Sequence, residues 1–147
     1  MGDVGEDTGE IVARDIPAPY VDERRRILLI DDSEIVLAIE GSLLMNAGFE
    51  VRAVSSLRAF LNTLLDWKPH IIITDLYMPE MSGADLCTWL RNQIATARTP
   101  IVICSSAPDA ELEEVARSVG ADGYLSKQQG LQELPAKLSA LCDEILW

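Results

Sequence analysis

Basic residues, aromatic residues and cysteines are all scarce in this chain of 147 residues, and the shortages exclude several classes of protein. The 12 Lys and Arg residues face 24 Asp and Glu, which gives a formal net charge of -12. Nucleic acids and anionic membrane surfaces are bound through cationic side chains, so we expect neither as a partner. The cysteines are odd in number and widely spaced among apolar residues, which indicates reduced core residues rather than a disulfide framework: Cys87, Cys104 and Cys142.

Long hydrophobic runs are also missing. No apolar stretch approaches the ~20 residues that a membrane-spanning helix needs, and the acidic N-terminus does not resemble a secretion signal. We therefore expect a cytoplasmic protein without a membrane-inserted segment. Hydrophobic residues nevertheless make up 48% of the chain, which is enough for one globular core at this length.

The first 25 residues differ in composition from the rest. Acidic residues dominate up to Glu23, and glycines and prolines recur between Gly2 and Pro19. Such a composition disfavours a packed structure. We expect residues 1–25 to be an acidic, flexible N-terminal extension and residues 26–147 to form the folded domain.

Apolar runs alternate with helical patterns through residues 26–147. The runs predict strands at 27–31, 49–54, 71–75, 101–105 and 122–126. Helices are expected near 33–47, 57–67, 84–96 and 108–119, with a last one from about Glu133, because Pro135 disfavours an earlier regular start. This alternation predicts an α/β fold, a doubly wound parallel sheet of five strands with helices on both faces.

The first expected helix has identifiable ends and apolar residues at helical spacing. Asp32 or Ser33 is expected to cap its beginning, and Gly48 its end. The apolar residues are Ile35, Val36, Ile39, Leu43 and Ala47.

Polar residues stand at the ends of four of the apolar runs: Asp31, Asp32, Asp75, Ser105 and Lys127. Ligands of parallel α/β sheets bind outside the carboxyl ends of the strands, so these side chains are expected to converge at one edge. Carboxylates are ligands of Mg²⁺, and the backbone carbonyl of Tyr77 is expected to add another oxygen. A carboxylate can accept a phosphoryl group, which an ammonium group and a hydroxyl then stabilise.

Each of these residues has a structural explanation when it is taken alone. Asp31 or Asp32 suits a helix N-cap, Asp75 suits a turn, and a single lysine is usually a solvated surface residue. The joint position of all five residues at strand ends favours a site for a divalent cation and a phosphoryl group.

Four segments of the chain resemble the receiver domain of two-component response regulators. They are LLIDDS at 28–33, ITDLYMPEMSG at 73–83, PIVICSSA at 100–107 and GADGYLSK at 120–127. The resemblance runs from about Arg26 to Trp147 and implies a flavodoxin-like (βα)5 receiver fold. It also implies a signalling switch rather than an enzyme.

The resemblance carries roles over to individual residues. Asp75 matches the phosphoacceptor, and Asp31 and Asp32 match the acidic pair that binds Mg²⁺. Lys127 and Ser105 match the residues that contact the phosphoryl group. Ser105 and Tyr124 match the switch residues, whose movement remodels the surface of the last two helices and the last strand.

The resemblance also implies partners. A histidine kinase or a histidine phosphotransfer protein would supply the phosphoryl group, and a downstream protein would read the remodelled surface. Because no further sequence follows the last expected helix, we expect a stand-alone, chemotaxis-type receiver, with an excerpt of a longer protein as the alternative.

One departure from the family pattern motivates an alternative. Gln128 follows Lys127 where the family usually has proline, so a trans bond is expected there and the orientation of Lys127 is in question. The alternative function is a degenerate receiver that acts as a phosphorylation-independent docking module.

Tyr77 is bulky and close to Asp75 in the sequence, which suggests that it shields an acyl phosphate from water.

Two other classes fit the sequence less well. Aspartate-nucleophile phosphatases need a second acid two residues after the nucleophile, where Tyr77 stands. A flavodoxin-like FMN carrier needs a hydroxyl- and glycine-rich first loop, whereas Asp31 and Asp32 would repel a phosphate.

Overall fold

The computed structural model describes residues 24–146, so the expected extension, except for its last two residues, lies outside the described part of the chain. Five strands form one sheet: β1 (Arg26–Ile30), β2 (Glu50–Val54), β3 (Ile71–Thr74), β4 (Ile101–Ser105) and β5 (Gly123–Ser126). Every neighbouring pair is parallel, in the order β2-β1-β3-β4-β5. The predicted doubly wound sheet is confirmed.

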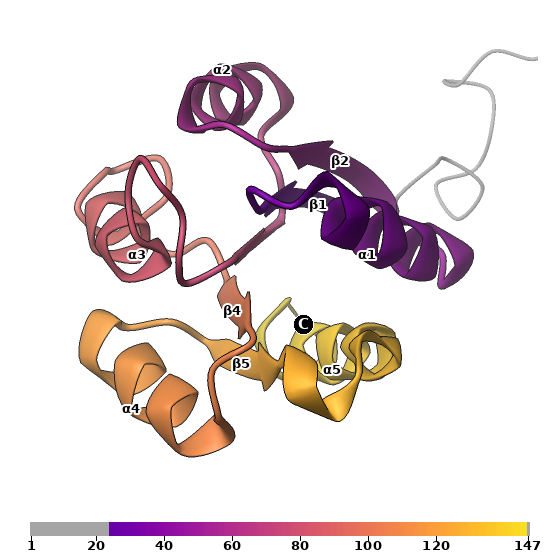
Figure 1. Cartoon of the computed structure of the whole chain (residues 1–147). Helices are drawn as coiled ribbons and strands as arrows, with labels where there is room; N and C mark the ends of the chain where they lie inside the picture. The colour runs from indigo at the N-terminus through magenta and orange to yellow at the C-terminus, as the bar shows by residue number, and fades with distance from the viewer. Residues whose placement is uncertain (1–23, 147) are drawn as a thin grey trace, which may run out of the picture.

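Helices cover both faces of the sheet (Figure 1). One face carries α1 (Glu34–Asn46) and α5 (Leu134–Leu141), and the other carries α2 (Leu57–Trp67), α3 (Gly83–Arg91) and α4 (Asp109–Val119). Alternate residues of β1 enter opposite layers, since Leu29 packs in the α1 and α5 layer and Leu28 in the α2 and α3 layer. The continuously apolar runs at 27–30, 71–73 and 101–103 therefore reflect burial on both sides.

The first helix forms as predicted, but its expected apolar residues do not mark the buried face. Ile35 is 75% exposed and Ile39 is 45% exposed. The side that meets the sheet carries Leu37, Glu40, Gly41 and Leu44. Because α1 has apolar residues around most of its circumference, hydrophobic spacing alone does not single out one face.

The ends of this helix follow ordinary capping chemistry. The Ser33 hydroxyl accepts a hydrogen bond from the Val36 amide at 3.3 Å, so Ser33 rather than Asp32 is the N-cap. Gly48 lies one residue beyond the C-cap Ala47 and has a left-handed φ of 99°.

Two elements in the second half of the chain differ from the sequence prediction. Helix α3 ends at Arg91 instead of continuing to 96, and Arg91 binds the Gly120 and Thr99 carbonyls at 3.0 Å and 2.7 Å. These contacts stabilise the turn that replaces the last part of the expected helix.

The last helix is assembled from several turns. Two short 3-10 helices, Lys127–Gln129 and Leu131–Glu133, precede α5, and a π-helical segment at Cys142–Leu146 follows it. Pro135 lies in the first turn of α5, where its missing amide hydrogen is not needed. None of the described helices is both long enough and apolar enough to cross a bilayer.

Candidate functional site

The carboxyl ends of β1 and β3 place two acidic residues side by side. Ile30 is paired in register with Thr74. Asp31 and Asp75 are therefore the first residues after two neighbouring strands, at the point where the strand order reverses. The Asp75 amide donates to the Ile30 carbonyl at 3.0 Å, which continues the ladder by one residue. The topology thereby builds the edge at which ligands of such sheets bind.

Three carboxylates meet at this edge. Asp31, Asp32 and Asp75 each offer one oxygen, and these atoms lie within 4.8 Å of one another. Asp31 and Asp75 are buried, whereas Asp32 is exposed. Three acids so close repel one another, and their oxygen atoms match the ligand chemistry of Mg²⁺, so the cluster fits a divalent cation.

Lys127 reaches the same cluster from the end of β5. Its Nζ atom donates to Asp31 Oδ2 at 2.6 Å and lies 3.7 Å from Asp75 Oδ1. Burial lowers the pKa of Lys127, but the Asp31 and Asp75 carboxylates outweigh burial and hold that pKa above its ordinary value. The peptide bond between Lys127 and Gln128 is trans, as expected. The trans bond therefore does not keep the ammonium group away from the acids.

The environment of Asp75 is distinct from that of an ordinary turn residue. One of its carboxylate oxygens accepts the Leu76 amide at 2.8 Å. Burial raises the pKa of Asp75, and Lys127 opposes this shift. Asp75 therefore combines a desolvated carboxylate with a nearby cation, an arrangement common at reactive positions.

Ser105 and Tyr124 lie on the adjacent strands β4 and β5. Ser105 is fully buried at the end of β4, and its hydroxyl has no hydrogen-bond partner of normal geometry although it contributes to lowering the pKa of Asp75. An unpartnered buried hydroxyl is uncommon and leaves a donor available. Tyr124 is half-buried on β5, and Lys137 Nζ lies 5.0 Å from the centre of its ring.

Tyr77 occupies the loop after β3 and is 56% exposed. Its hydroxyl donates to the carboxylate of Glu111 in α4, so the side chain connects this loop to the first turn of that helix. This contact could not be read from the sequence. The role of the Tyr77 carbonyl as a metal ligand stays a prediction.

Sequence reasoning missed one buried acid. Glu40 on α1 is 2% exposed and one of its carboxylate oxygens has no hydrogen-bond partner. Burial raises its pKa to about 7, and the charges of Lys127, Asp31 and Asp75 also act on it. The available signal was its spacing, since Glu40 lies three residues after Leu37 and four before Leu44.

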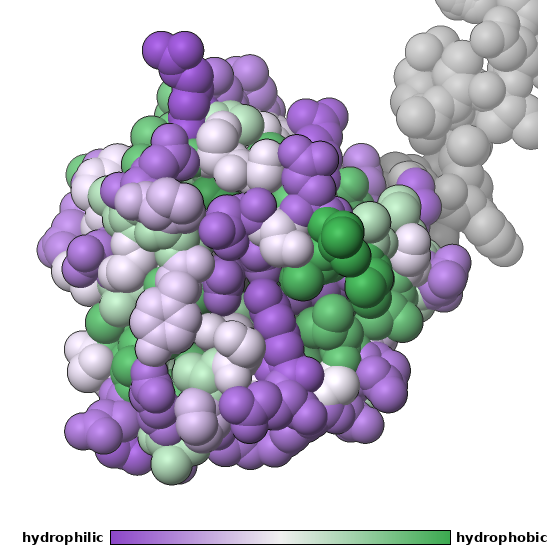
Figure 2. Space-filling view, in the orientation of Figure 1, coloured by the Kyte–Doolittle hydropathy of each residue, from purple (hydrophilic) through white to green (hydrophobic). Residues whose placement is uncertain are grey.

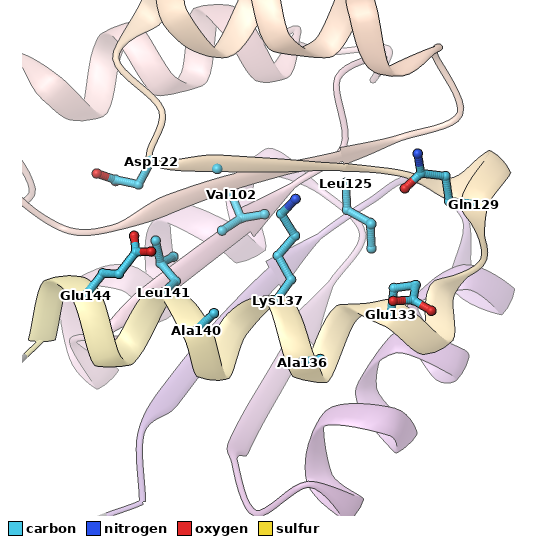
Figure 3. Close-up of a pocket in the computed structure, with 11 residues that line it drawn as sticks. Val102, Asp122, Leu125, Gln129, Glu133, Ala136, Lys137, Ala140, Leu141 and Glu144 are labelled. Carbon is cyan, nitrogen blue, oxygen red and sulfur yellow. The ribbon is translucent and has the colours of Figure 1, made fainter.

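A separate groove of about 670 Å³ lies over β5 and along α5 (Figure 3). Lys137 extends from α5 across the middle of the groove, while Asp122 and Glu144 lie at one end and Gln129 and Glu133 at the other. Its lining includes none of the three clustered aspartates. The groove is therefore distinct from the acidic cluster.

Several curated proteins are similar to this chain in sequence. The chain is 33% identical over 117 residues to the transcriptional regulatory protein GltR of Pseudomonas aeruginosa, covering 80% of this chain and 48% of that protein. It is 30% identical to the protein PilG of the same organism over 117 residues, which covers 78% of this chain and 85% of PilG. The chain thus spans about half the length of several curated relatives, including GltR and the regulatory protein SphR of Synechococcus elongatus.

Solved structures agree with the sequence relatives. The chemotaxis response regulator CheY4 of Vibrio cholerae has a TM-score of 0.73 at 27% identity, covering 80% of this chain and 98% of CheY4. Residues 27–139 match the family described as the response regulator receiver domain. Receiver domains are signalling switches rather than enzymes, they generally bind Mg²⁺ at an acidic pocket, and they interact with histidine kinases and downstream partners. The (βα)5 sheet, the acidic edge and the family match together establish that this chain belongs to the receiver domains of two-component response regulators.

Proposed function

We propose that residues 26–147 form a phosphorylation-dependent signalling switch in which Asp75 accepts a phosphoryl group. The observation that carries this proposal is the position of Asp75, which shares the carboxylate cluster and has the Lys127 ammonium group 3.7 Å away. A buried carboxylate with a cation beside it is suited to nucleophilic attack on phosphorus. The oxygen of Asp75 forms the new bond as the bond between phosphorus and a donor histidine nitrogen breaks.

The remaining cluster residues have complementary roles in this proposal. Asp31, Asp32, Asp75 and the backbone carbonyl of Tyr77 would hold Mg²⁺, which supplies positive charge to the phosphoryl oxygens. The Lys127 ammonium group pairs with the same oxygens. The unpartnered Ser105 hydroxyl donates a hydrogen bond to one of them, which removes an unsatisfied buried group.

The surface of α1 suggests where the phosphodonor docks. Ile35 and Ile39 are exposed just after the acidic loop, and a hydrophobic patch covers α1 on the face shown in Figure 2. Exposed apolar patches beside a reactive site are typical of protein contacts. We infer that a histidine kinase or a histidine phosphotransfer protein contacts this face.

The output of the switch is assigned to the opposite end of the sheet. Movement of Ser105 toward the phosphoryl group makes room for Tyr124, and this shift changes the groove along β5 and α5 that a downstream protein would read. We place this switch in the cytoplasm. At a net charge of -12, we expect neither nucleic acid nor a membrane surface among its partners.

Intact mass spectrometry tests the proposal. The protein is incubated with phosphoramidate or acetyl phosphate, with Mg²⁺ or with EDTA, and Asp75→Asn serves as the matched variant. We expect a phosphoryl-sized mass gain only in the unmutated chain and only with Mg²⁺. No gain with either donor would instead favour the phosphorylation-independent docking module.

A further inference from the structure

Side chains of the turn after β5 hold the loop after β4. The β4–β5 ladder ends where Ser105 pairs with Ser126, and beyond that point both segments leave the sheet. Ser105 opens the loop that leads to α4, and Lys127 opens the 3-10 turn that leads toward α5. The two proposed phosphoryl-binding side chains therefore stand at the bases of two separate loops.

Three side chains bridge these loops. Gln128 Nε2 donates to the Ser106 carbonyl at 2.7 Å, and Gln129 donates to the carboxylate of Asp109. Ser126 Oγ donates to the Ala107 carbonyl at 2.7 Å. We call the contacts of Gln128 and Gln129 the glutamine tether.

The contact of Gln128 lies just beyond the end of the β4–β5 ladder. The Ser106 carbonyl is the first one past the end of the β4–β5 ladder, and it accepts a hydrogen bond from the side-chain amide of Gln128. This contact extends the pairing of the two segments beyond the sheet. It joins Ser106, which follows Ser105, to Gln128, which follows Lys127.

We propose that Gln128 is a positioning residue for phosphorylation, which fixes the loop beginning at Ser105 relative to Lys127. Through this contact, the loop that carries the hydroxyl is held against the turn that carries the ammonium group. Gln129 anchors the same turn to the first residue of α4. The inference rests on the proposed function of the acidic site.

The size of the effect follows from the exposure of the contact. Gln128 is exposed, and a hydrogen bond of this kind between neutral groups contributes modestly. Its loss is expected to slow phosphorylation roughly two- to tenfold. The Mg²⁺ dependence should not change, because the three clustered aspartates belong to other loops.

The test uses Gln128→Met, which keeps the side-chain length and removes the donor. Gln132→Met is the matched control, since Gln132 is an exposed glutamine one turn further along the chain. The rate of mass gain is measured against phosphoramidate and Mg²⁺ concentration. Each variant is measured alone and in combination with Ser105→Ala. We expect Gln128→Met to lower the maximal rate two- to tenfold in the natural background and to have no further effect with Ser105→Ala.

Hydrogen exchange of the unphosphorylated protein provides a second readout. Peptides spanning residues 105–110 should exchange faster in Gln128→Met than in Gln132→Met. An unchanged maximal rate, or an equal loss in the Ser105→Ala background, would overturn the positioning role. If the unmutated chain gains no phosphoryl group at all, the proposed function fails, and unchanged exchange at residues 105–110 then rejects the tether independently.

Discussion

The ammonium group of Lys127 lies 2.6 Å from Asp31 Oδ2, closer than any contact it makes with Asp75. Asp31 is buried, and its Oδ1 atom accepts a hydrogen bond from the Ser33 amide at 2.9 Å. Both oxygens of the Asp31 carboxylate therefore have a partner. This ion pair engages a carboxylate that we assign to Mg²⁺ binding. Lysine and the metal ion therefore compete for Asp31.

This competition predicts the effect of Lys127→Met. Removing the ammonium group frees Asp31 and leaves three carboxylates without a compensating charge, so Mg²⁺ should bind roughly three- to tenfold more tightly. Phosphorylation should slow at the same time. Titration calorimetry with Mg²⁺ measures the affinity, and Lys137→Met on α5 provides a variant with the same charge change. Weaker or unchanged Mg²⁺ binding in Lys127→Met would contradict the competition.

The strand ends were predictable because burial on both faces leaves a plain signal in the sequence. Runs such as residues 71–73 are continuously apolar, and the polar residues after each run mark the edge of the sheet. The meeting of Asp31, Asp75 and Lys127 followed from this pattern and from the family resemblance. Their close approach is observed, while their chemical roles stay predictions.

Features that depend on tertiary packing were not predictable from local patterns. The buried face of α1 is decided by the sheet beneath it, so Glu40 is buried although Ile35 is not. Some contacts join residues that are far apart in the sequence, such as those of Tyr77 with Glu111 and of Gln128 with Ser106. No local sequence pattern indicates which residues will meet in this way. The early end of α3 similarly depends on contacts of Arg91 with residues after it in the chain.

Glu40 predicts a dependence of stability on pH. Its pKa is raised from 4.5 to about 7 in the folded state, so the folded protein holds a proton that the unfolded chain releases. The free energy of unfolding should therefore fall as pH rises from 4.5 through 7, by roughly 3 kcal/mol in all. Below pH 4.5 this penalty is absent.

Urea unfolding of Glu40→Gln at pH 5 and pH 8 measures this penalty. Relative to the unmutated protein, the variant should gain about 2 to 3 kcal/mol between these two pH values, because the amide does not ionise. Glu114→Gln, on the exposed side of α4, should show no such gain. An equal response of both variants would show that burial of Glu40 does not control the pH dependence.

Tyr77 predicts a long lifetime for the aspartyl phosphate. Its ring follows Asp75 by two residues, and the hydrogen bond to Glu111 holds it toward α4. We expect Tyr77→Ala to speed the loss of the phosphoryl group severalfold by admitting water, and Tyr77→Phe to have a smaller effect because it keeps the ring. The decay of the phosphorylated mass after removal of the donor measures these lifetimes. Rapid loss from the unmutated protein would exclude the shielding role.

Two buried glycines predict opposite effects of the same substitution. A Cβ atom on Gly83 would lie 2.1 Å from the backbone oxygen of Asp75, whereas one on Gly41 would meet nothing within 4 Å. Because backbone atoms cannot yield as a flexible side chain can, Gly83→Ala must displace the loop after β3. We expect it to destabilise the protein by about 1 to 3 kcal/mol.

Gly41→Ala should instead stabilise the protein by up to about 1 kcal/mol, since alanine favours a helix interior such as that of α1. Urea unfolding of both variants compares the two free energies under the same conditions. Displacement of the Asp75 backbone by Gly83→Ala should also slow phosphorylation, while Gly41→Ala should leave its rate unchanged. A stable Gly83→Ala protein with a normal phosphorylation rate would mean that the loop after β3 can move without disturbing Asp75, and the close approach would then not constrain the site.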